Sequence, residues 1–167
     1  MRKFPLFLVS FLVLISCNQN PMRIISPAFE NEGEIPANYT CDGQNVNPPL
    51  SFVGTPADAQ TLALIVDDPD APAGDWTHWL VWNVDPSTKQ LNENALISEA
   101  MQGTNDFGKL GWGGPCPPSG SHRYFFRLYA LDTRLDLPDS AKKADLLQAM
   151  EGHILETAEL MGKYKRP

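Results

Sequence analysis

The chain has 167 residues and a formal net charge of −7 at pH 7. An N-terminal segment reads as a targeting signal, and the roughly 150 residues that follow it suit one domain with a hydrophobic core of its own. The acidic balance argues against binding to the nucleic acid backbone, which attracts basic surfaces. The 15 prolines and 12 glycines are spread along the chain. They predict many turns between short elements, which favours β architecture.

The N-terminus has the pattern of an export signal. Arg2 and Lys3 precede a mostly apolar run over residues 4–15, and this run is too short to span a bilayer. It ends in Leu14-Ile15-Ser16-Cys17, which resembles the lipobox of bacterial lipoproteins. The resemblance implies cleavage before Cys17, with lipid attached to its sulfur and to its new amino group. The alternative is the short hydrophobic N-terminus of a cytosolic protein that happens to end in cysteine.

The lipobox also sets the expected boundaries along the chain. We expect a lipoprotein signal peptide over residues 1–16, a lipidated tether over residues 17–21 and one folded domain over residues 22–167, since no internal repeat or linker follows the tether. Acyl chains on Cys17 attach a water-soluble domain to a membrane surface. The expected location is the bacterial cell envelope, lipid-anchored and facing the periplasm or the exterior.

Two further cysteines, Cys41 and Cys116, lie in segments rich in glycine and proline. Disulfides persist in exported proteins, so a bridge between the two is the first hypothesis. Two free thiols are the alternative, because sequence alone does not show that the two Cα atoms come close enough.

Strand patterns dominate the middle of the chain. Residues 61–66 form a short apolar run that predicts a strand buried on both faces. Residues 78–84 place His78, Leu80 and Trp82 on one face and mostly apolar side chains on the other, as in a central strand. In residues 122–131, the face that begins with His122 and Tyr124 is apolar from there on.

Helical signals are confined to the last third of the chain. After Pro138, Asp139 or Ser140 can cap a helix whose apolar face would carry Ala144, Leu147 and Met150, with Leu146 beside them. Residues 154–164 fit both helical and strand spacing, and propensity alone favours a helix. Strands that are apolar on both faces need cover on each side, so we expect two packed sheets with a peripheral helix.

Several polar residues stand out against this apolar framework. Asp67, Asp68 and Asp70 are placed by the pattern in a loop after the first buried strand, where they either serve a site or simply cap a turn. His78 and His122 each begin a strand, a position that more often holds a structural histidine than a ligand-binding one. The segment 111–120 is rich in glycine and proline, so it either offers backbone amides to an anion or merely connects two strands.

In this order, three stretches resemble the phosphatidylethanolamine-binding protein family, and within it the bacterial branch called Raf kinase inhibitor-like. They are Asp68-Pro69-Asp70-Ala71-Pro72, then Trp76-Thr77-His78-Trp79 with Val81-Trp82-Asn83, then Gly114-Pro115-Cys116-Pro117-Pro118-Ser119-Gly120-Ser121-His122-Arg123-Tyr124. Weaker matches at Ser26-Pro27-Ala28-Phe29, Tyr39-Thr40-Cys41-Asp42-Gly43, Pro48-Pro49-Leu50-Ser51 and residues 152–164 extend the resemblance over nearly all of the expected domain.

The resemblance implies a mainly β, two-sheet β-sandwich with a small peripheral C-terminal helix, and it makes residues after about Ile154 a strand. It also implies an anion pocket at one end of the large sheet. The residues expected to bind the ligand are Asp68, His78, His122, Tyr124 and Asp70, with Trp76, Gly114 and Pro117 at the rim. Phe52 stands where many relatives carry tryptophan, and the segment between Cys116 and His122 is shorter than in animal relatives.

The resulting functional hypothesis is non-enzymatic binding of a small phosphate- or carboxylate-bearing ligand, such as a phospholipid head group, without cofactor, metal or catalytic residue. A metal-dependent or His/Asp-based hydrolase that uses Asp68, Asp70, His78 and His122 is the alternative, although the chain has neither a His-Glu-x-x-His nor a Gly-x-Ser-x-Gly motif. A scaffold that binds another envelope protein is a third class. The expected partners are the anion and the membrane that holds Cys17; the resemblance adds a homodimer, and no protein partner is identified.

Overall fold

The computed structural model describes residues 20–95 and 100–167. The predicted signal peptide and Cys17 lie outside the described residues. Within them, the strands are β1 (Arg23–Ile25), β2 (Leu50–Val53), β3 (Thr61–Asp68), β4 (Trp76–Val84), β5 (Gln90–Leu91), β6 (Met101–Gln102), β7 (Ser121–Leu131) and β8 (Ile154–Lys165). The helices are the 3-10 turn η1 (Ala37–Tyr39) and α1 (Lys143–Met150). In the part of the chain that is described, no helix is long and apolar enough to cross a membrane.

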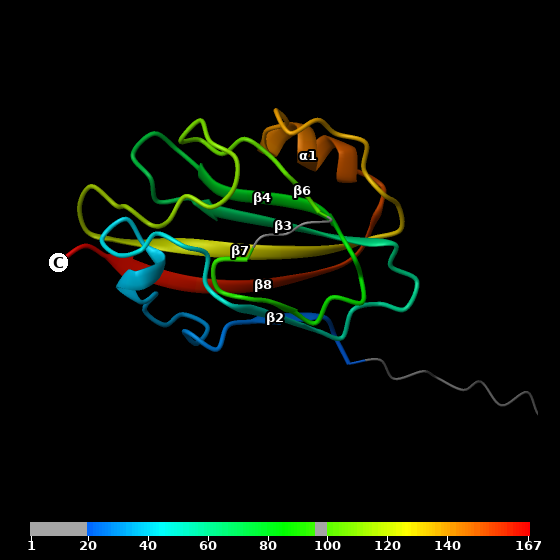
Figure 1. Ribbon diagram of the computed structural model, residues 1–167, viewed down its shortest axis with the longest axis horizontal. Coiled ribbons are helices and arrows are strands. Elements are labelled where there is room, and N and C mark those ends of the chain that lie inside the picture. The colour runs from blue at the N-terminus through cyan, green and yellow to red at the C-terminus, as the bar shows by residue number, and fades with distance from the viewer. Residues whose placement is uncertain (1–19, 96–99) are drawn as a thin grey trace, which may run out of the picture.

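The strands form a three-stranded sheet in the order β1-β2-β5 and a five-stranded sheet in the order β6-β4-β3-β7-β8. All neighbouring strands are antiparallel. In Figure 1 the five-stranded sheet crosses the middle of the molecule, with the small sheet below it and α1 above. The predicted β-sandwich with a peripheral helix is therefore confirmed.

The central strand β3 shows why the layers form. All eight of its residues are buried, because both of its faces are covered. Leu62, Leu64 and Val66 join the apolar cluster shared with the small sheet, and Ala63 and Ile65 join the cluster beneath α1. Full burial of each large aliphatic side chain stabilises the fold by about 1.5–3 kcal/mol.

The prediction that Asp139 or Ser140 caps the C-terminal helix is wrong. The helix begins at Lys143, with Lys142 at the N-cap, whose backbone N–H donates to the Asp145 carboxylate at 2.9 Å. Residues 139–140 form a turn instead. The carboxylate three residues into the helix thus accepts from the amide of the N-cap residue, as the N3 side chain does in a capping box.

The apolar face of α1 is also narrower than predicted. Leu146 and Met150 are buried against the five-stranded sheet, whereas Leu147 is 41% exposed and Ala144 is exposed too. Because the helix has only eight residues, a stripe of residues four apart is enough to hold it on the sheet.

The propensity-based helix over residues 154–164 is wrong, and the strand implied by the family resemblance is present. β8 pairs with β7 from Leu131↔Ile154 to Ser121↔Lys165. Continuous pairing with a long neighbouring strand satisfies the backbone of β8, and this tertiary context overrides its local helical preference.

Candidate functional site

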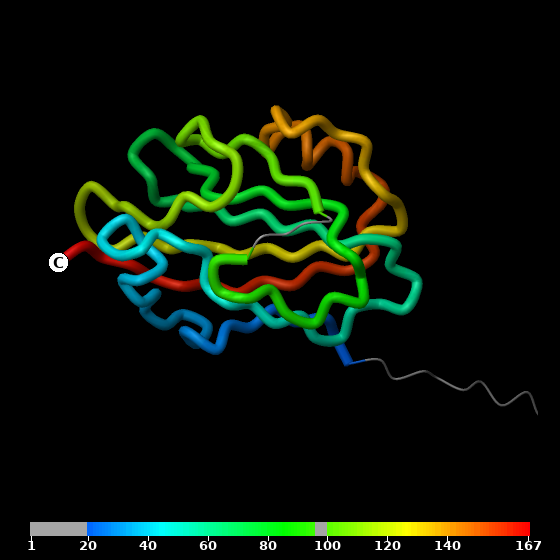
Figure 2. Tube along the Cα trace, in the orientation of Figure 1, coloured from blue at the N-terminus to red at the C-terminus, as the bar shows by residue number. Residues whose placement is uncertain are grey.

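A pocket of about 240 Å³ opens at the end of the five-stranded sheet where β3 ends and β7 begins. Figure 2 shows that the connections around residues 40, 70 and 115 gather toward this end of the molecule. The pocket is lined by Asp68, Trp76, His78, Phe107, Cys116, Pro117, Pro118 and His122, together with residues 71–73. Of the eight predicted ligand-binding residues, five line it: Asp68, His78, His122, Trp76 and Pro117.

Strand alternation brings Asp68 and His122 to the same face. β3 runs two residues beyond the predicted run, so Asp67 and Asp68 belong to the strand rather than to the loop expected from the sequence. Asp67 pairs with Phe125 of β7, which sets Asp68 beside the stretch that contains His122 and Tyr124. Asp68, His122 and Tyr124 thus lie on the side of the sheet that faces β1 and β2.

A β-bulge adds His78 to this group. Val66 pairs with Trp79 and Asp67 pairs with Thr77, so His78 is an extra residue in β4. The prediction placed His78 on the same face as Leu80 and Trp82, but those two side chains pack beneath α1 while His78 lines the pocket. A bulge re-aims a side chain in this way because it breaks the two-residue period of the strand.

Asp68 orients the imidazole of His122. Its Oδ2 accepts a hydrogen bond from Nδ1 of His122 at 2.7 Å, and its Oδ1 accepts one from the backbone N–H of Asp70 at 2.8 Å. Asp68 is only 3% exposed and His122 only 7%. Since a carboxylate only accepts, Nδ1 of His122 carries the hydrogen and its Nε2 is left for a ligand.

Gly113 orients the imidazole of His78 in a similar way. Nδ1 of His78 donates to the carbonyl oxygen of Gly113, whose own N–H donates to the carbonyl oxygen of His78 at 3.0 Å. Burial lowers the pKa of His78, and the Gly113 carbonyl and the charge of Asp68 oppose this shift only in part. His78 is therefore neutral at pH 7.

Tyr124 lies beneath the pocket rather than in its lining. Its ring meets that of His78 edge-on, with 5.2 Å between the ring centres, and the residue is fully buried. Its hydroxyl has no hydrogen-bond partner among the described residues. Burial, followed by the negative charge of Asp68, raises the pKa of Tyr124. The phenol therefore stays protonated, and its ring packs against that of His78 beneath the pocket.

Asp70 does not line the pocket either; it clamps the turn after β3 onto β7. Its carboxylate accepts hydrogen bonds from Nε and Nη2 of Arg123 at 2.8 and 2.7 Å, and one from the Arg123 backbone N–H at 2.9 Å. The side-chain bond from Arg123 is the main reason that the pKa of Asp70 falls to about 2. This clamp keeps Asp68 beside His122.

Gly114 serves the packing of the loops and does not line this pocket. Its N–H donates to Oδ1 of Asn45 at 2.8 Å, and the N–H of Gly113 is engaged by His78. Neither of these two amides is free for an anion. A Cβ at Gly114 would lie 2.5 Å from Oδ1 of Asn45 and 2.6 Å from the carbonyl oxygen of Tyr39, so only glycine fits this approach.

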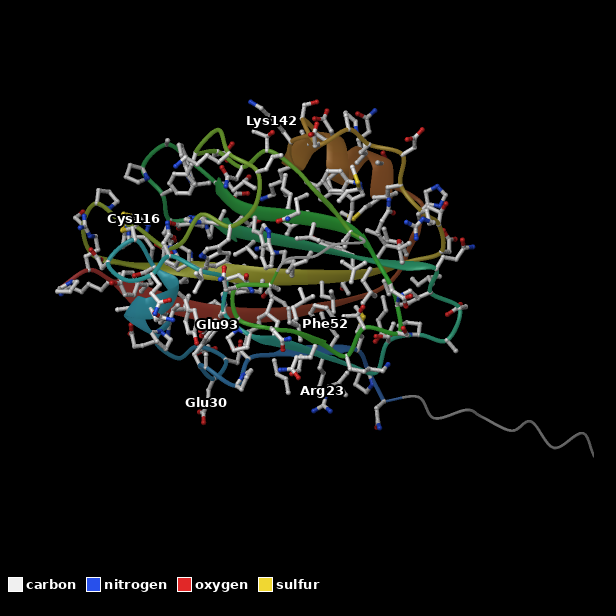
Figure 3. The ribbon with its side chains drawn as sticks, in the orientation of Figure 1. Arg23, Glu30, Phe52, Glu93, Cys116 and Lys142 are labelled. Carbon is white, nitrogen blue, oxygen red and sulfur yellow. A yellow bond between two sulfur atoms is a disulfide. The ribbon has the colours of Figure 1, made fainter. Side chains whose placement is uncertain are left out.

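A disulfide joins Cys41 to Cys116, with an S–S distance of 2.06 Å and a Cα–Cα distance of 5.4 Å. Figure 3 shows Cys116 at the pocket end of the sandwich. The backbone N–H of Cys41 also donates to the carbonyl oxygen of Pro115 at 3.1 Å. The bridge thus fixes the segment that carries Cys116 and Pro117 as one wall. No cis peptide bond occurs among the described residues.

Sequence reasoning missed Phe107 and Asn105. Phe107 meets the rings of Trp76 and His78 edge-on, with 5.5 and 5.3 Å between ring centres, and lines the pocket. Buried Asn105 shapes this loop, since its Oδ1 accepts the backbone N–H groups of Phe107 and Lys109. The only sequence signal for this part of the lining was Phe107 itself, a single aromatic residue within a segment of turn-forming residues.

The donors and acceptors of the site are arranged to hold a small polar group against apolar walls. Trp76, Phe107 and Pro117 supply apolar surface, while the imidazoles supply directional contacts. Over residues 20–95 and 100–167, no three His, Cys, Asp or Glu side chains come together in a way that could hold a metal ion.

Comparisons with known proteins agree with this architecture. Residues 25–165 match the family model described as phosphatidylethanolamine-binding protein. A UPF0098 protein of Methanothermobacter thermautotrophicus is 55% identical over 150 residues, covering 87% of this chain and 99% of that protein. A crystal structure of a phosphatidylethanolamine-binding protein homolog from Chlamydia trachomatis has a TM-score of 0.86 at 46% identity and covers 89% of this chain and 99% of its own. The structure of Escherichia coli YbcL, described as a member of the mammalian family, has a TM-score of 0.83 at 29% identity over 89% of this chain and all of its own.

Proposed function

The chain belongs to the phosphatidylethanolamine-binding protein family, and from this premise we propose that it is a non-enzymatic protein that binds a small phosphate- or carboxylate-bearing ligand in the pocket between β3, β4 and β7. The ligand is either free or presented as a phospholipid head group. His78 and His122 contact the anionic group of the ligand. The rest of the bound ligand is surrounded by Trp76, Phe107 and Pro117.

One observation carries this proposal: two imidazoles from distant strands line one pocket, each anchored through Nδ1 and each with Nε2 unpartnered among the described residues. This anchoring leaves two polar Nε2 atoms beside apolar walls, which is unfavourable in free energy unless a ligand pairs with them. A protonated imidazole donates to an oxyanion through Nε2–H, and a neutral imidazole accepts at Nε2 from a ligand hydroxyl.

The pocket volume limits how much of a ligand can enter. About 240 Å³ holds a phosphate or a small head group, whereas pockets that enclose drug-sized molecules run from roughly 300 to 1,000 Å³. If the ligand is a phospholipid, its acyl chains therefore stay outside.

A hydrolase in which Asp68 or Asp70 acts as the general base would need that carboxylate free. Both oxygens of Asp68 are already hydrogen-bonded, and Asp70 is paired with Arg123. These contacts favour the binding role.

Isothermal titration of the full chain with inorganic phosphate tests the proposal. We expect saturable binding at one site, and a loss of at least tenfold in affinity for His122→Ala. His153→Ala is the matched control, because His153 is an exposed histidine paired with Asp132 outside the pocket. Equal affinity of both variants would count against the pocket.

We also propose that the chain is a lipoprotein of the bacterial cell envelope, with a signal peptide over residues 1–16, a tether over residues 17–21 and the folded domain over residues 22–167. The sequence Leu14-Ile15-Ser16-Cys17 supports this assignment. Mass spectrometry of the membrane fraction should find an acylated N-terminal Cys17, and Cys17→Ser should move the protein out of that fraction. A full-length, unmodified N-terminus in wild type would refute it.

The three matched stretches around Asp68, His78 and His122 further support a place in the Raf kinase inhibitor-like branch, where relatives act by docking on partners. An envelope location separates the chain from cytosolic kinases, so its partner would be another envelope protein or a second copy of itself. Cross-linking in intact cells, followed by identification of the linked chain, tests both.

A further inference from the structure

The two pocket histidines are engaged through the same ring nitrogen. Nδ1 of His78 faces the carbonyl oxygen of Gly113, and Nδ1 of His122 faces the carboxylate of Asp68. Both partners only accept hydrogen bonds, so both Nδ1 atoms carry a hydrogen. A neutral imidazole carries one hydrogen in total, so in the neutral state both Nε2 atoms are acceptors.

This arrangement is unfavourable for a fully deprotonated anion. Its oxygens would meet two lone pairs, and the pocket lining contains no lysine or arginine to offset them. Arg123, the nearby cation, is committed to Asp70. At least one proton must therefore enter the pocket with the anion, on an imidazole or on the ligand.

The two histidines do not take up this proton equally. Protonated His122 would form a hydrogen-bonded ion pair with Asp68 at 2.7 Å. His78 has only a neutral carbonyl as its partner, and its ring lies between Phe107 and Tyr124 with 3% exposure. His122 is thus suited to become the donor, and His78 stays an acceptor.

The other charged groups around His78 do not change this assignment. On β3, Asp68 faces both rings but is bonded to His122, and Asp67 points to the opposite side, toward Arg127 and Lys143. From the loop before β7, the Asp106 carboxylate accepts the backbone N–H of Thr77 at 2.7 Å. From β7, Tyr124 is a neutral phenol whose pKa is raised by burial.

Building on the proposed anion-binding function, we propose that the pocket selects oxyanions that bear an acidic hydroxyl, namely phosphate and phosphate monoesters in monoprotonated form, over phosphate diesters and sulfate. The ligand P–OH donates to Nε2 of His78, and a P–O⁻ oxygen accepts from Nε2–H of His122. The proton on His122 comes from solvent. A diester, such as the phosphate that joins most phospholipid head groups to their lipid, has no P–OH and leaves the acceptor of His78 unpaired. Of the two ligand sources proposed above, this selectivity favours the free ligand.

Methyl phosphate and dimethyl phosphate provide the sharpest test. Below the second phosphate pKa, which is about 6, both are singly charged, and they differ by one P–OH. In isothermal titration of the full chain at pH 5.5, we expect methyl phosphate to bind at least tenfold more tightly than dimethyl phosphate. Repeating the titration in buffers of different ionisation enthalpy should show net proton uptake at pH 7.

A variant locates the selectivity at His78. In His78→Gln the side-chain amide can donate, so the preference for the monoester should fall at least fivefold, while His153→Gln keeps it. Equal affinities of wild type for the two esters, without proton uptake, would overturn this inference and leave the anion pocket intact. Binding of neither ester, nor of phosphate, would overturn the proposed function and the inference together.

Discussion

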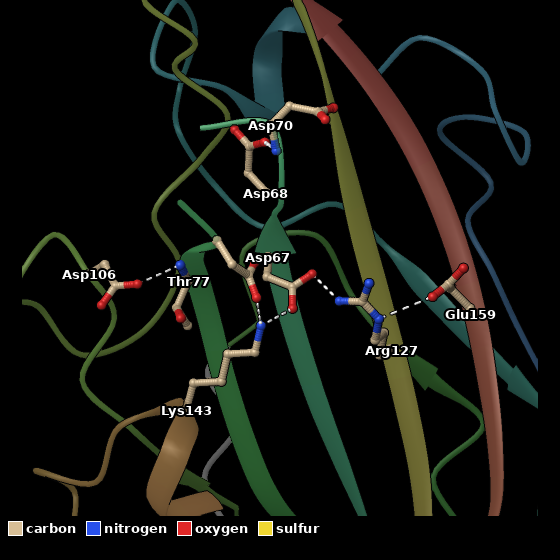
Figure 4. Close-up of polar contacts among 9 residues, drawn as sticks. Asp67, Asp68, Asp70, Thr77, Asp106, Arg127, Lys143 and Glu159 are labelled. Carbon is tan, nitrogen blue, oxygen red and sulfur yellow. Dashed lines mark hydrogen bonds and ion pairs between the residues drawn. The ribbon is translucent and has the colours of Figure 1, made fainter. Parts of the chain in front are cut away.

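Asp67 and Asp68 are consecutive residues of β3 whose carboxylates lie on opposite faces of the five-stranded sheet. Asp67 forms ion pairs with Arg127 of β7 and Lys143 of α1, whereas Asp68 is bonded to His122 in the pocket. Figure 4 shows Asp67 pointing to those two cations and Asp68 lying beside Asp70, away from them. The strand period thus separates a carboxylate that holds the layers together from one that orients a binding group.

This separation predicts opposite effects of two adjacent substitutions. Asp67→Asn should lower the free energy of unfolding by about 1.5 kcal/mol, because Arg127 and Lys143 lose their buried partner and keep only Glu159 and Asp75, and should leave phosphate affinity unchanged. Asp68→Asn should weaken phosphate binding at least tenfold, because the His122 imidazolium loses its counter-charge. Urea denaturation and isothermal titration measure the two quantities. Equal loss of affinity in both variants would show that the two faces are not independent.

The Asp70–Arg123 clamp predicts a loss of stability in strong acid. The folded-state pKa of Asp70 is about 2, below its usual value of 3.8. The clamp therefore contributes fully above pH 4, and its contribution disappears as the pH falls from about 4 to 2. Since Arg123 is half exposed, solvent screening limits the contribution to about 1 kcal/mol. Comparing wild type with Asp70→Asn by denaturation at pH 6 and pH 2.5 should show a difference at pH 6 that shrinks at pH 2.5; a constant difference would contradict the clamp.

Buried, neutral His78 predicts a second pH dependence at milder acidity. Its folded-state pKa lies below the usual 6.5, so the unfolded chain binds the proton more readily. Stability from His78 is then complete above about pH 6.5 and decreases as the pH falls below that value. Denaturation of wild type and His78→Gln without phosphate, from pH 7.5 to 5, should show a steeper fall for wild type. Parallel curves would mean that folding does not lower the pKa of His78.

The disulfide predicts a large stability change with a small effect on the strand framework. Cys41 and Cys116 are 75 positions apart in the sequence, and closing a loop of that length stabilises a fold by about 4 kcal/mol in the chain-entropy model. Cys41→Ser together with Cys116→Ser should lower the free energy of unfolding by up to that amount and weaken phosphate binding, because Cys116 and Pro117 form one pocket wall. Circular dichroism should retain the β signal. Unchanged phosphate affinity would show that the wall holds its position without the bridge.

Local sequence patterns predicted much of the sheet framework. The apolar run at residues 61–66 and the alternation in residues 122–131 predicted β3 and β7 to within two residues, and the alternation also placed His122 and Tyr124 on one face. These signals are local, because the two-residue alternation of a strand can be read from consecutive residues. The resemblance to the phosphatidylethanolamine-binding protein family, rather than a local pattern, implied that Asp68, His78 and His122 meet at one end of the large sheet.

Several features depend on contacts between segments that are distant in the sequence, and these became clear only from the three-dimensional structure. The pairing of β8 with β7 overrode a helical propensity, and the bulge at His78 became visible only in the register between β3 and β4. Tyr124 was predicted in the pocket lining but lies beneath the pocket, against His78. Asp70 was predicted to bind the ligand but is bonded to Arg123. No local pattern links either residue to its partner. Contacts between distant segments are set by packing and pairing of the whole fold, so a one-dimensional pattern does not contain them.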